Sequence, residues 1–289
     1  SDADSTTEKD SVSEDNPHTI LCVIPNIGNP FYTDVLKGIQ RAASLHNYSI
    51  FLYSNTISET NIDLIIELMK PYHFAGALIL MELDESILDR LSALFPIVEC
   101  SDYTEGTKHS FVTVDNYYAA KEAVNYLISI GRKNIAIVSN SPENYTFSKY
   151  RIKAYEDALS ENGLTTMPYK KLLFPSREFD FSTVSAAVAA MLSLDNGIDG
   201  IFCTSDLFAA AAIHGCSEMG FDVPKRVKII GFDNIDISIV TSPALTTINQ
   251  PRFNIGFTAC KFLIDAITDP SLPPQQTFLK TELIIRSST

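Results

Sequence analysis

Four short segments of the sequence combine residue types that could bind a small polar molecule. They are Asn29-Pro30-Phe31-Tyr32, Arg151 at the start of an expected helix, Thr204-Ser205-Asp206, and Gly231-Phe232-Asp233-Asn234. An aromatic ring can stack on the face of a sugar or a purine, and an arginine facing an aspartate can divide the donors and acceptors of a polyol between them. A structural interpretation exists beside this one, because Asp206 and Asp115 would also serve as helix caps and Asn29-Pro30 as a turn.

Motifs of common enzyme chemistry do not occur in the sequence. It contains no G-x-G-x-x-G or G-x-x-x-x-G-K-[ST] cradle for phosphates and no G-x-S-x-G turn for a nucleophilic serine. The histidines lack the spacing of metal ligands and are expected at the surface or at helix ends. They are His18, His46, His73, His109 and His214. We therefore expect no enzyme activity, no metal and no cofactor.

Short apolar strands alternate with helices along nearly the whole chain, in two series of which the second opens at Ile135. Strands that read as unbroken Ile, Leu and Val runs between helices are typical of parallel sheets covered on both faces. We therefore predict an α/β fold with two doubly wound parallel-sheet lobes and a ligand cleft at the carboxyl ends of their strands. The expected strands lie at 20–24, 50–53, 77–80, 97–99, 112–114 and 135–138, and near residues 172, 201 and 229.

Composition restricts the partners and the compartment. The 289 residues carry a net charge of -13 without a cluster of Lys and Arg, so this chain by itself should not bind DNA. The longest apolar stretches are too short to span a bilayer, and no secretion signal opens the chain. The cysteines are odd in number and unpaired in spacing, which favours reduced thiols and a cytoplasmic location. They are Cys22, Cys100, Cys203, Cys216 and Cys260.

The order of the distinctive segments resembles that of the lac/gal repressor family, whose sensing domain shares its fold with periplasmic sugar-binding proteins. I-P-N-I-G-N-P-F-Y at 24–32 resembles the opening strand and turn of the family. The most specific matches are I-I-G-F-D-N at 229–234, P-A-L-T-T-I-N-Q-P at 243–251 and the ending T-E-L-I-I-R-S-S-T at 281–289. The resemblance covers almost the whole chain and implies two lobes joined by three crossovers.

The resemblance also implies the lobe boundaries. Residues 1–17, with six acidic residues against one lysine, are expected to be a disordered acidic tail or linker. The first lobe would comprise 18–132 and 249–274, and the second lobe 133–248 and 275–289.

Seven residues are assigned to the ligand site by this resemblance. Arg151 and Asp233 would make the principal polar contacts, and we expect them to bind the ligand without holding the fold together. Phe179 or Phe181 would stack on the ligand. The predicted site consists of Phe31, Tyr32, Asp102, Arg151, Ser205, Asp233 and Gln250.

Two departures from the family pattern bear on the ligand. The family's R-x-x-G-F reads here as Arg151-Ile152-Lys153-Ala154-Tyr155, so the glycine is replaced. Ser205 stands where relatives often have an asparagine that reaches the ligand. Both changes argue against a plain hexose.

The function implied by the resemblance is effector sensing in a transcriptional repressor. A small metabolite (a sugar, a sugar phosphate or a purine-like molecule) would bind between the lobes and shift a closure equilibrium that controls DNA binding. Operator DNA would be reached through an amino-terminal helix-turn-helix, which this chain lacks. A homodimer is implied, and a phosphorylated corepressor protein is a further candidate partner. The alternatives are a periplasmic-type solute receptor for transport or chemotaxis and, third, an enzyme on the same fold.

Overall fold

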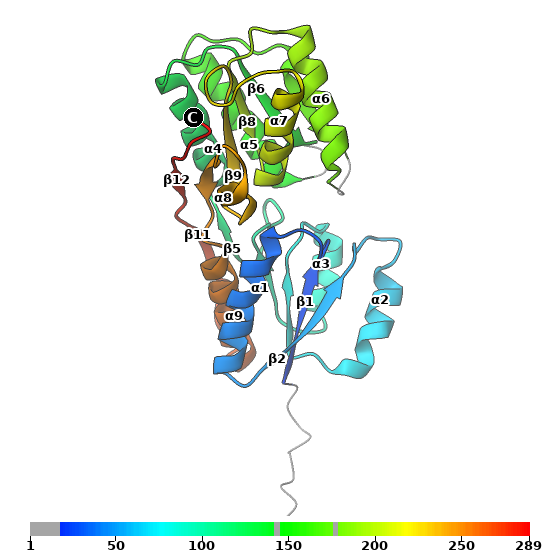
Figure 1. The fold of residues 1–289 in the computed structure, drawn as a ribbon. Helices are drawn as coiled ribbons and strands as arrows, with labels where there is room; N and C mark the ends of the chain where they lie inside the picture. The colour runs from blue at the N-terminus through cyan, green and yellow to red at the C-terminus, as the bar shows by residue number, and fades with distance from the viewer. Residues whose placement is uncertain (1–17, 142–144, 176–178) are drawn as a thin grey trace, which may run out of the picture.

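Two six-stranded sheets, each covered by helices on both faces, form the two lobes seen one above the other in Figure 1. The structure is a computed structural model that describes residues 18–141, 145–175 and 179–289. The expected acidic tail at 1–17 lies outside the described residues. The predicted α/β fold with two doubly wound, periplasmic-binding-protein-like lobes is confirmed.

The first sheet has the strand order β11-β5-β4-β3-β1-β2 and is parallel throughout. Its strands are β1 (Thr19–Ile24), β2 (Ser49–Ser54), β3 (Gly76–Ile79), β4 (Ile97–Cys100), β5 (Ser110–Val114) and β11 (Gln276–Leu279). Alternate residues of a strand point to opposite faces, so a strand between two helical layers must be apolar on both. In β1, Ile20 and Cys22 face one helical layer while Leu21 and Val23 face the other.

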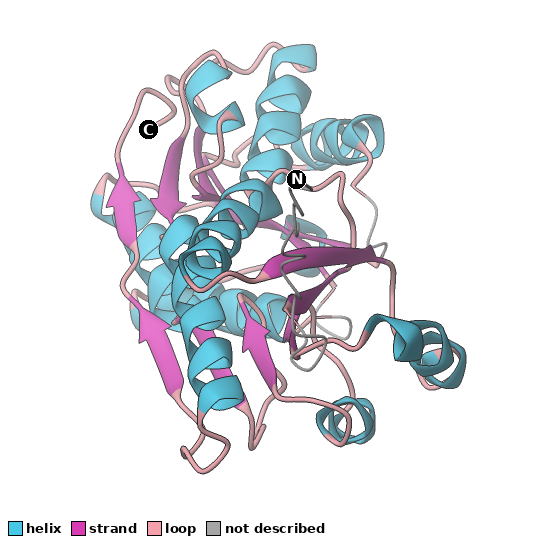
Figure 2. Cartoon of the chain, turned by 90° about the horizontal axis from the view of Figure 1, so that it is seen from below, coloured by secondary structure: helices cyan, strands magenta, loops and turns pink. Residues whose placement is uncertain are grey.

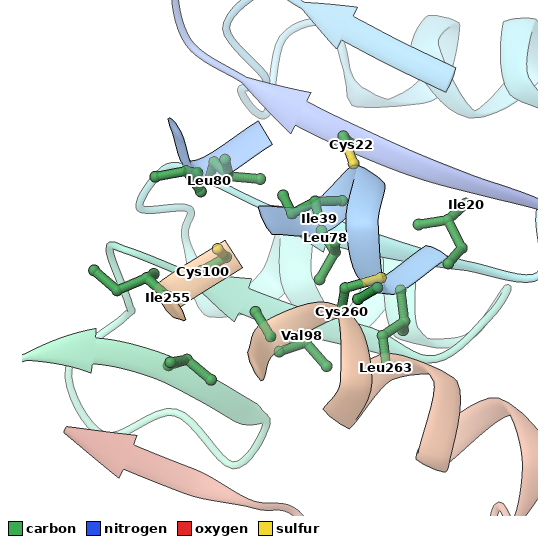
Figure 3. Packing of buried hydrophobic residues seen from close by; sticks show 14 of the residues in the cluster. Ile20, Cys22, Ile39, Leu78, Leu80, Val98, Cys100, Ile255, Cys260 and Leu263 are labelled. Carbon is green, nitrogen blue, oxygen red and sulfur yellow. The ribbon is translucent and has the colours of Figure 1, made fainter. Parts of the chain in front are cut away.

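Four helices cover the first sheet: α1 (Phe31–Leu45) and α9 (Arg252–Thr268) on one face, α2 (Ile62–Met69) and α3 (Glu85–Ser92) on the other. Figure 3 shows Cys22, Cys100 and Cys260 among aliphatic side chains of the first of these layers. All five cysteines are free and buried. Burial raises the pKa of the Cys22 and Cys100 thiols, and it raises the pKa of Cys260 to about 12. These shifts keep the three thiols protonated and unreactive.

The second sheet has the order β12-β10-β9-β8-β6-β7 and is parallel except for its edge strand β12. Its strands are β6 (Ile135–Asn140), β7 (Lys171–Phe174), β8 (Gly200–Cys203), β9 (Lys228–Asp233), β10 (Thr246–Asn249) and β12 (Glu282–Ile284). Its helices are α4 (Asn116–Ser129), α5 (Thr146–Glu161), α6 (Phe181–Leu194), α7 (Asp206–Glu218) and the short α8 (Ile237–Val240). Figure 2 shows the helices around the sheets in a view from below.

Within the described residues, three connections run between the sheets: from β5 to α4, from β10 to α9, and from β11 to β12. These places differ from the expected boundaries at two points. Helix α4 packs with α5 over the second sheet, because Ala120, Val124 and Leu127 share a buried cluster with Ile137 of β6. Strand β11 pairs with β5 of the first sheet, although 275–289 was expected in the second lobe. The first crossover therefore lies before α4, and not after it as the expected boundary at residue 132 implies.

Candidate ligand-binding cleft

A cavity of about 410 Å³ lies between the carboxyl ends of the two sheets. This volume is in the range of small-molecule sites, and residues of both lobes line it. A second cavity of about 740 Å³ adjoins this inner cavity and shares seven lining residues with it: Asn29, Tyr32, Asp102, Asn140, Phe147, Phe179 and Leu207. All seven residues of the predicted site line the inner cavity; whether they bind ligand stays a prediction. They are Phe31, Tyr32, Asp102, Arg151, Ser205, Asp233 and Gln250.

Arg151 is the buried cation of the cavity, 5% exposed, in the second turn of α5. Its Nε and Nη2 donate to Asn116 Oδ1 at 2.9 and 2.7 Å, and Nη1 donates to the Thr204 carbonyl at 2.6 Å. Its guanidinium carbon lies 3.6 Å from the ring centre of Phe232, a stacking arrangement suited to a planar cation. Burial lowers the pKa of Arg151 to about 10, with Asp233 acting in the opposite direction, so the side chain is charged at neutral pH.

These bonds correct one expectation. Arg151 joins α4, α5 and the end of β8 within the second lobe, so it has a structural role as well as a place in the cavity. The expectation that it would not help to hold the fold together is wrong. Three of its five N–H donors are engaged inside the lobe. The guanidinium is therefore fixed before any ligand arrives.

Asp233 is the carboxylate that faces this cation from the end of β9. Its φ of 113° and that of 56° at Asn234 make a sharp left-handed turn, which Asp and Asn tolerate better than most residues. Gln250 Nε2 donates to Asp233 Oδ1 at 2.8 Å. Burial raises the pKa of Asp233 to about 6, although Arg151 and Gln250 act to lower it.

Asp206 lies behind this turn and outside the cavity lining. Its Oδ2 accepts the backbone N–H of Ile235 at 2.8 Å, and its Oδ1 accepts the Thr247 hydroxyl at 2.6 Å. Gly231 leaves room for it, because a Cβ there would lie 2.3 Å from Asp206 Oδ1. Burial and the nearby Asp233 raise the pKa of Asp206 well above its usual range. Asp206 thus holds the turn that presents Asp233.

The expected helix caps turn out differently at the two positions. Asp115 caps α4 by accepting the Tyr118 N–H at 2.9 Å, as predicted. The cap of α7 is Ser205, whose hydroxyl accepts the Phe208 N–H at 3.2 Å, so the prediction for Asp206 is wrong. The hydroxyl of Ser205 is therefore occupied by the helix while its side chain lines the cavity.

The first lobe contributes aromatic rings and one carboxylate. Phe31 and Tyr32 open α1 and meet edge to face at 5.3 Å, after a turn in which Asn29 Oδ1 accepts the Phe31 N–H at 3.0 Å. The Tyr32 hydroxyl donates to the Leu80 carbonyl at 3.4 Å, and burial raises its pKa. Asp102 follows β4 after Ser101, whose φ of 71° turns the chain at the cavity.

The two candidate phenylalanines near α6 lie differently with respect to the cavities. Phe179 lines both cavities and lies 5.8 Å from the ring of Phe208. Phe181 is absent from the lining of both described cavities, and its ring packs on His214 at 5.4 Å. Sequence reasoning missed Asn116, which fixes Arg151, and Phe147, whose ring lies 4.9 Å from the guanidinium. The only sequence signals are that Asn116 follows the N-cap Asp115 and that Phe147 lies one helical turn before Arg151.

A bridge of polar contacts connects the lobes at the β10–α9 connection beside Gln250. Arg252 Nη2 lies 2.9 Å from Asp34 Oδ2 of α1 and donates to the Asn234 carbonyl at 3.0 Å. Asn234 also donates to Asn249 Oδ1 at 3.0 Å. The turn that carries Asp233 is thereby tied to the first lobe.

The residues that the structure describes contain neither a metal-binding cluster nor a membrane-spanning helix. No group of three or more His, Cys, Asp or Glu side chains is arranged to hold a metal ion. None of the helices in the described ranges has both the length and the apolar character that a membrane span requires.

Comparisons with known proteins agree with this geometry. Residues 124–289 match the family described as periplasmic binding protein-like domain. The chain is 33% identical over 286 residues to the HTH-type transcriptional repressor CytR of Escherichia coli K12, covering 96% of this chain and 81% of the relative. A putative transcriptional regulator LacI from Bacillus cereus superposes with a TM-score of 0.86 at 25% identity, over 95% of this chain and 99% of that one. A LacI family regulator from Enterococcus faecium, solved with bound ribose, gives 0.81 at 25% identity, over 94% and 98%.

Proposed function

Because this chain belongs to the LacI family of transcriptional regulators and contains its effector-binding region, we propose that its cleft binds an uncharged, hydroxylated ring compound, a sugar or a nucleoside-like molecule. The observation that carries the proposal is the meeting of a fixed cation–carboxylate pair, Arg151 and Asp233, with aromatic rings from both lobes in one cavity of about 410 Å³. Charged groups make the stronger hydrogen bonds to hydroxyls, and aromatic faces stack on rings.

The charges of the cavity argue against a phosphorylated effector. Asp102, Asp180 and Asp233 line it together with Arg151, the one Lys or Arg of the described lining. The guanidinium already donates to Asn116 and Thr204. A phosphate would therefore bring negative charge toward three carboxylates, with a single cation in the lining to balance them. The ribose bound by the Enterococcus faecium relative is a compound of the proposed class.

The effector acts by shifting an equilibrium between open and closed lobes. A ligand that contacts both lobes stabilises the closed state, and only this difference in affinity can change the population of states. In our proposal the closed state sets the spacing of DNA-binding segments in a homodimer. Those segments would be helix-turn-helix units preceding this region, and a phosphorylated corepressor protein would act on the same equilibrium.

The alternative of a periplasmic-type receptor is less supported than regulation of transcription. The relatives reported above are transcriptional regulators. The five free, buried cysteines suit a reducing cytoplasm, which is where we place the protein. For the lobes we propose 18–114 with 252–279 and 116–249 with 282–289, on the support of the strand pairing.

A thermal-shift panel tests the effector class. Ribose, hexoses, nucleosides and their phosphate esters would be compared at equal concentration. A ligand at about one hundred times its dissociation constant adds roughly 2.7 kcal/mol of stability. We expect a shift from an uncharged member and a smaller one from its phosphate ester. A panel in which only the phosphorylated compounds shift the melting temperature would contradict the proposal.

Arg151→Ala tests the site with the best compound of that panel. We expect the ligand shift to disappear and the empty protein to lose about 1–3 kcal/mol, because the carbonyl oxygens of Asn116 and Thr204 lose their donor. Lys153→Ala is the matched control. Lys153 lies on the same helix but is exposed and paired with Asp157 at 2.7 Å. An unchanged ligand shift in Arg151→Ala would remove Arg151 from the site.

A further inference from the structure

The first turn of α5 in the second lobe is capped by a side chain from the first lobe. Glu82 follows β3, and its Oε2 accepts the backbone N–H of Thr146 at 2.8 Å while its Oε1 accepts the Thr146 hydroxyl at 2.6 Å. The cap residue of the helix itself, Tyr145, makes no side-chain capping bond. The first N–H groups of a helix have no partner inside it, and a carboxylate placed there also meets the positive end of the helix dipole. Helices commonly meet this need with a side chain directly before or within their first turn, and here a residue of the other lobe meets it.

A second carboxylate of the first lobe reaches the same helix one turn later. Glu105 Oε2 lies 2.7 Å from Lys149 Nζ, and the Tyr150 hydroxyl donates to Glu105 Oε1 at 3.0 Å. These partners lower the pKa of Glu105. Lys149 and Glu105 are both more than half exposed. Their ion pair therefore stabilises the contact between the lobes less than the part-buried hydrogen bonds of Glu82 do.

A hydrogen bond joins the two loops that carry Glu82 and Glu105. Thr104, next to Glu105, donates its hydroxyl to the Leu83 carbonyl at 2.7 Å, which ties the loop after β4 to the loop after β3. The Thr104 N–H donates to Glu99 Oε1 at 2.6 Å, and Glu99 is fully buried in β4. Because the loops are joined, Glu82 and Glu105 approach or leave α5 together.

The helix that they hold is the one that carries the cation of the cavity. Phe147 and Arg151 of α5 line the inner cavity, while Thr146, Lys149 and Tyr150 contact the first lobe. Helix α5 therefore both lines the cavity and contacts the first lobe. Movement of its amino-terminal turn away from Glu82 must also move Arg151 away from Phe31 and Tyr32.

We infer that Glu82 and Glu105 form a latch that holds the lobes closed through the amino-terminal turn of α5, and that this latch sets how far the ligand-free protein is closed. The inference concerns the empty protein. It therefore does not depend on the identity of the effector.

Spin labels across the mouth of the cleft would measure the latch. Leu64 on α2 and Ala190 on α6 are exposed and lie in different lobes, so Leu64→Cys and Ala190→Cys provide the attachment sites. The five native cysteines are buried and should not react with the label under native conditions. The distance distribution would be recorded by pulsed electron resonance without ligand, in the parent and in E82Q, E105Q and E82Q/E105Q.

The matched control is E161Q on the same helix. Glu161 pairs with Lys121 of α4 at 2.7 Å, so this variant loses a carboxylate contact of α5 inside one lobe. We expect E82Q to lower the ratio of short to long distances by about tenfold, as a charge-assisted bond becomes a neutral one. E105Q should lower it less, the double variant most, and E161Q not at all.

The inference fails if the parent and the double variant give the same distribution, or if E161Q lengthens the distances as much as E82Q. Circular dichroism of each labelled variant checks the fold. Should E82Q unfold, E105Q still decides, because Glu105 is exposed and its replacement leaves the core intact. In that case an E105Q distribution equal to that of the parent would overturn the latch.

Discussion

The two lobes are built on the same strand order and differ in what they bring to the cleft. Read from the same edge, the sheets run β2-β1-β3-β4-β5-β11 and β7-β6-β8-β9-β10-β12. In each, the first strand of the series lies inside and the last comes from the end of the chain. They differ at that last strand, since β11 is parallel to β5 and β12 is antiparallel to β10.

The cleft-facing residues differ more than the frame does. The second lobe contributes Arg151 and Asp233, held by bonds from Asn116 and Gln250 within the lobe or beside it. The first lobe contributes Phe31 and Tyr32 at the start of a helix, together with the latch carboxylates. The two lobes thus share a strand order and differ in their cleft residues. The second lobe presents the fixed pair Arg151 and Asp233, and the first lobe places the rings of Phe31 and Tyr32 opposite them.

The helical layers differ as well. In the first lobe α1 and α9 cross at two glycines, where a Cβ on Gly38 would lie 2.0 Å from the Phe253 carbonyl oxygen and one on Gly256 the same distance from that of Val35. In the second lobe α6 and α7 cross at Gly215, whose Cβ would lie 2.6 Å from the Ser185 carbonyl oxygen. The first lobe therefore has the tighter crossing, and the following predictions test this contrast between the lobes.

The largest effect is expected from Gly38→Ala. The added methyl group meets backbone, which cannot rotate away, so we expect a loss of about 3 kcal/mol or more. That corresponds to a fall in melting temperature of roughly 6–12 °C. Gly215→Ala should cost less, because its contact is longer. Calorimetry of both variants measures the difference, and equal losses would show that the crossings are equally tight.

Asp206→Ala is expected to cost about 2–4 kcal/mol, because the buried Ile235 N–H and Thr247 hydroxyl both lose their acceptor. The comparison is Asp84→Ala, an exposed aspartate that precedes α3 in the first lobe and makes no capping bond. It should stay within about 0.5 kcal/mol. Chemical denaturation of the two variants checks this, and a similar cost for both would mean that Asp206 does not support the Asp233 turn.

The pH dependence of stability should have opposite signs at two carboxylates, Asp233 of the second lobe and Asp34 of the first. Asp233 has a pKa raised to about 6, so the folded state keeps a proton that the unfolded state loses near pH 4. The free energy of unfolding should therefore fall as pH rises between about 4 and 6, on the order of 1–3 kcal/mol. Asp233→Asn should reduce that fall and leave the part that comes from Asp206, whose pKa is also raised.

Asp34 of the first lobe provides the opposite case. Lys37 and then Arg252 lower its pKa, so its contribution is present above about pH 4 and is lost as pH falls through the lowered value. Asp34→Asn should weaken the protein near neutral pH and leave the decline between pH 4 and 6 in place. Denaturation curves across this range would contradict the assignment if Asp233→Asn kept the full decline.

The smallest effects concern two tyrosine hydroxyls. In the second lobe, the Tyr155 hydroxyl donates to the Ile135 carbonyl at 2.7 Å, whereas the Tyr32 hydroxyl of the first lobe lies 3.4 Å from the Leu80 carbonyl. We expect Tyr155→Phe to cost about 1–1.5 kcal/mol and Tyr32→Phe about 0.5 kcal/mol or less. Thermal melts of both variants test the order, and a larger loss in Tyr32→Phe would reverse it.

The fold was largely predictable because its signal is local. Unbroken apolar runs such as Ile135 to Val138 of β6, followed by helices, indicate parallel sheets from periodicity alone. The lobe boundaries were harder to place. A helix after β5 would pack equally well on either sheet from its own sequence, and only the contacts of α4 with α5 assign it to the second lobe.

The seven predicted residues all line the cavity, and the resemblance to the lac/gal repressor family is what assigned them. What the sequence could not reveal were contacts over long separations, such as Arg151 with Asn116 and Thr146 with Glu82. An asparagine after a cap and a glutamate after a strand are common, and their role depends on which helix end the fold brings near. Arg151 was misjudged for the same reason, since its structural bonds span 35 and 53 residues.

The pairing of β11 with β5 and the crossing of α9 with α1 bear on how the chain is made. Residues 116–249 contain five strands of the second sheet in one continuous stretch. The first lobe, in contrast, lacks α9 and β11 until residues 252–279 have been synthesised, a wait of more than a hundred residues. At a synthesis rate of about 5–20 residues per second, that wait lasts roughly ten to thirty seconds. During this interval the face of α1 that carries Gly38 has no partner helix, so it is exposed to chaperones. On the ribosome, the lobe that begins second therefore has five of its six strands before the lobe that began first receives α9 and β11.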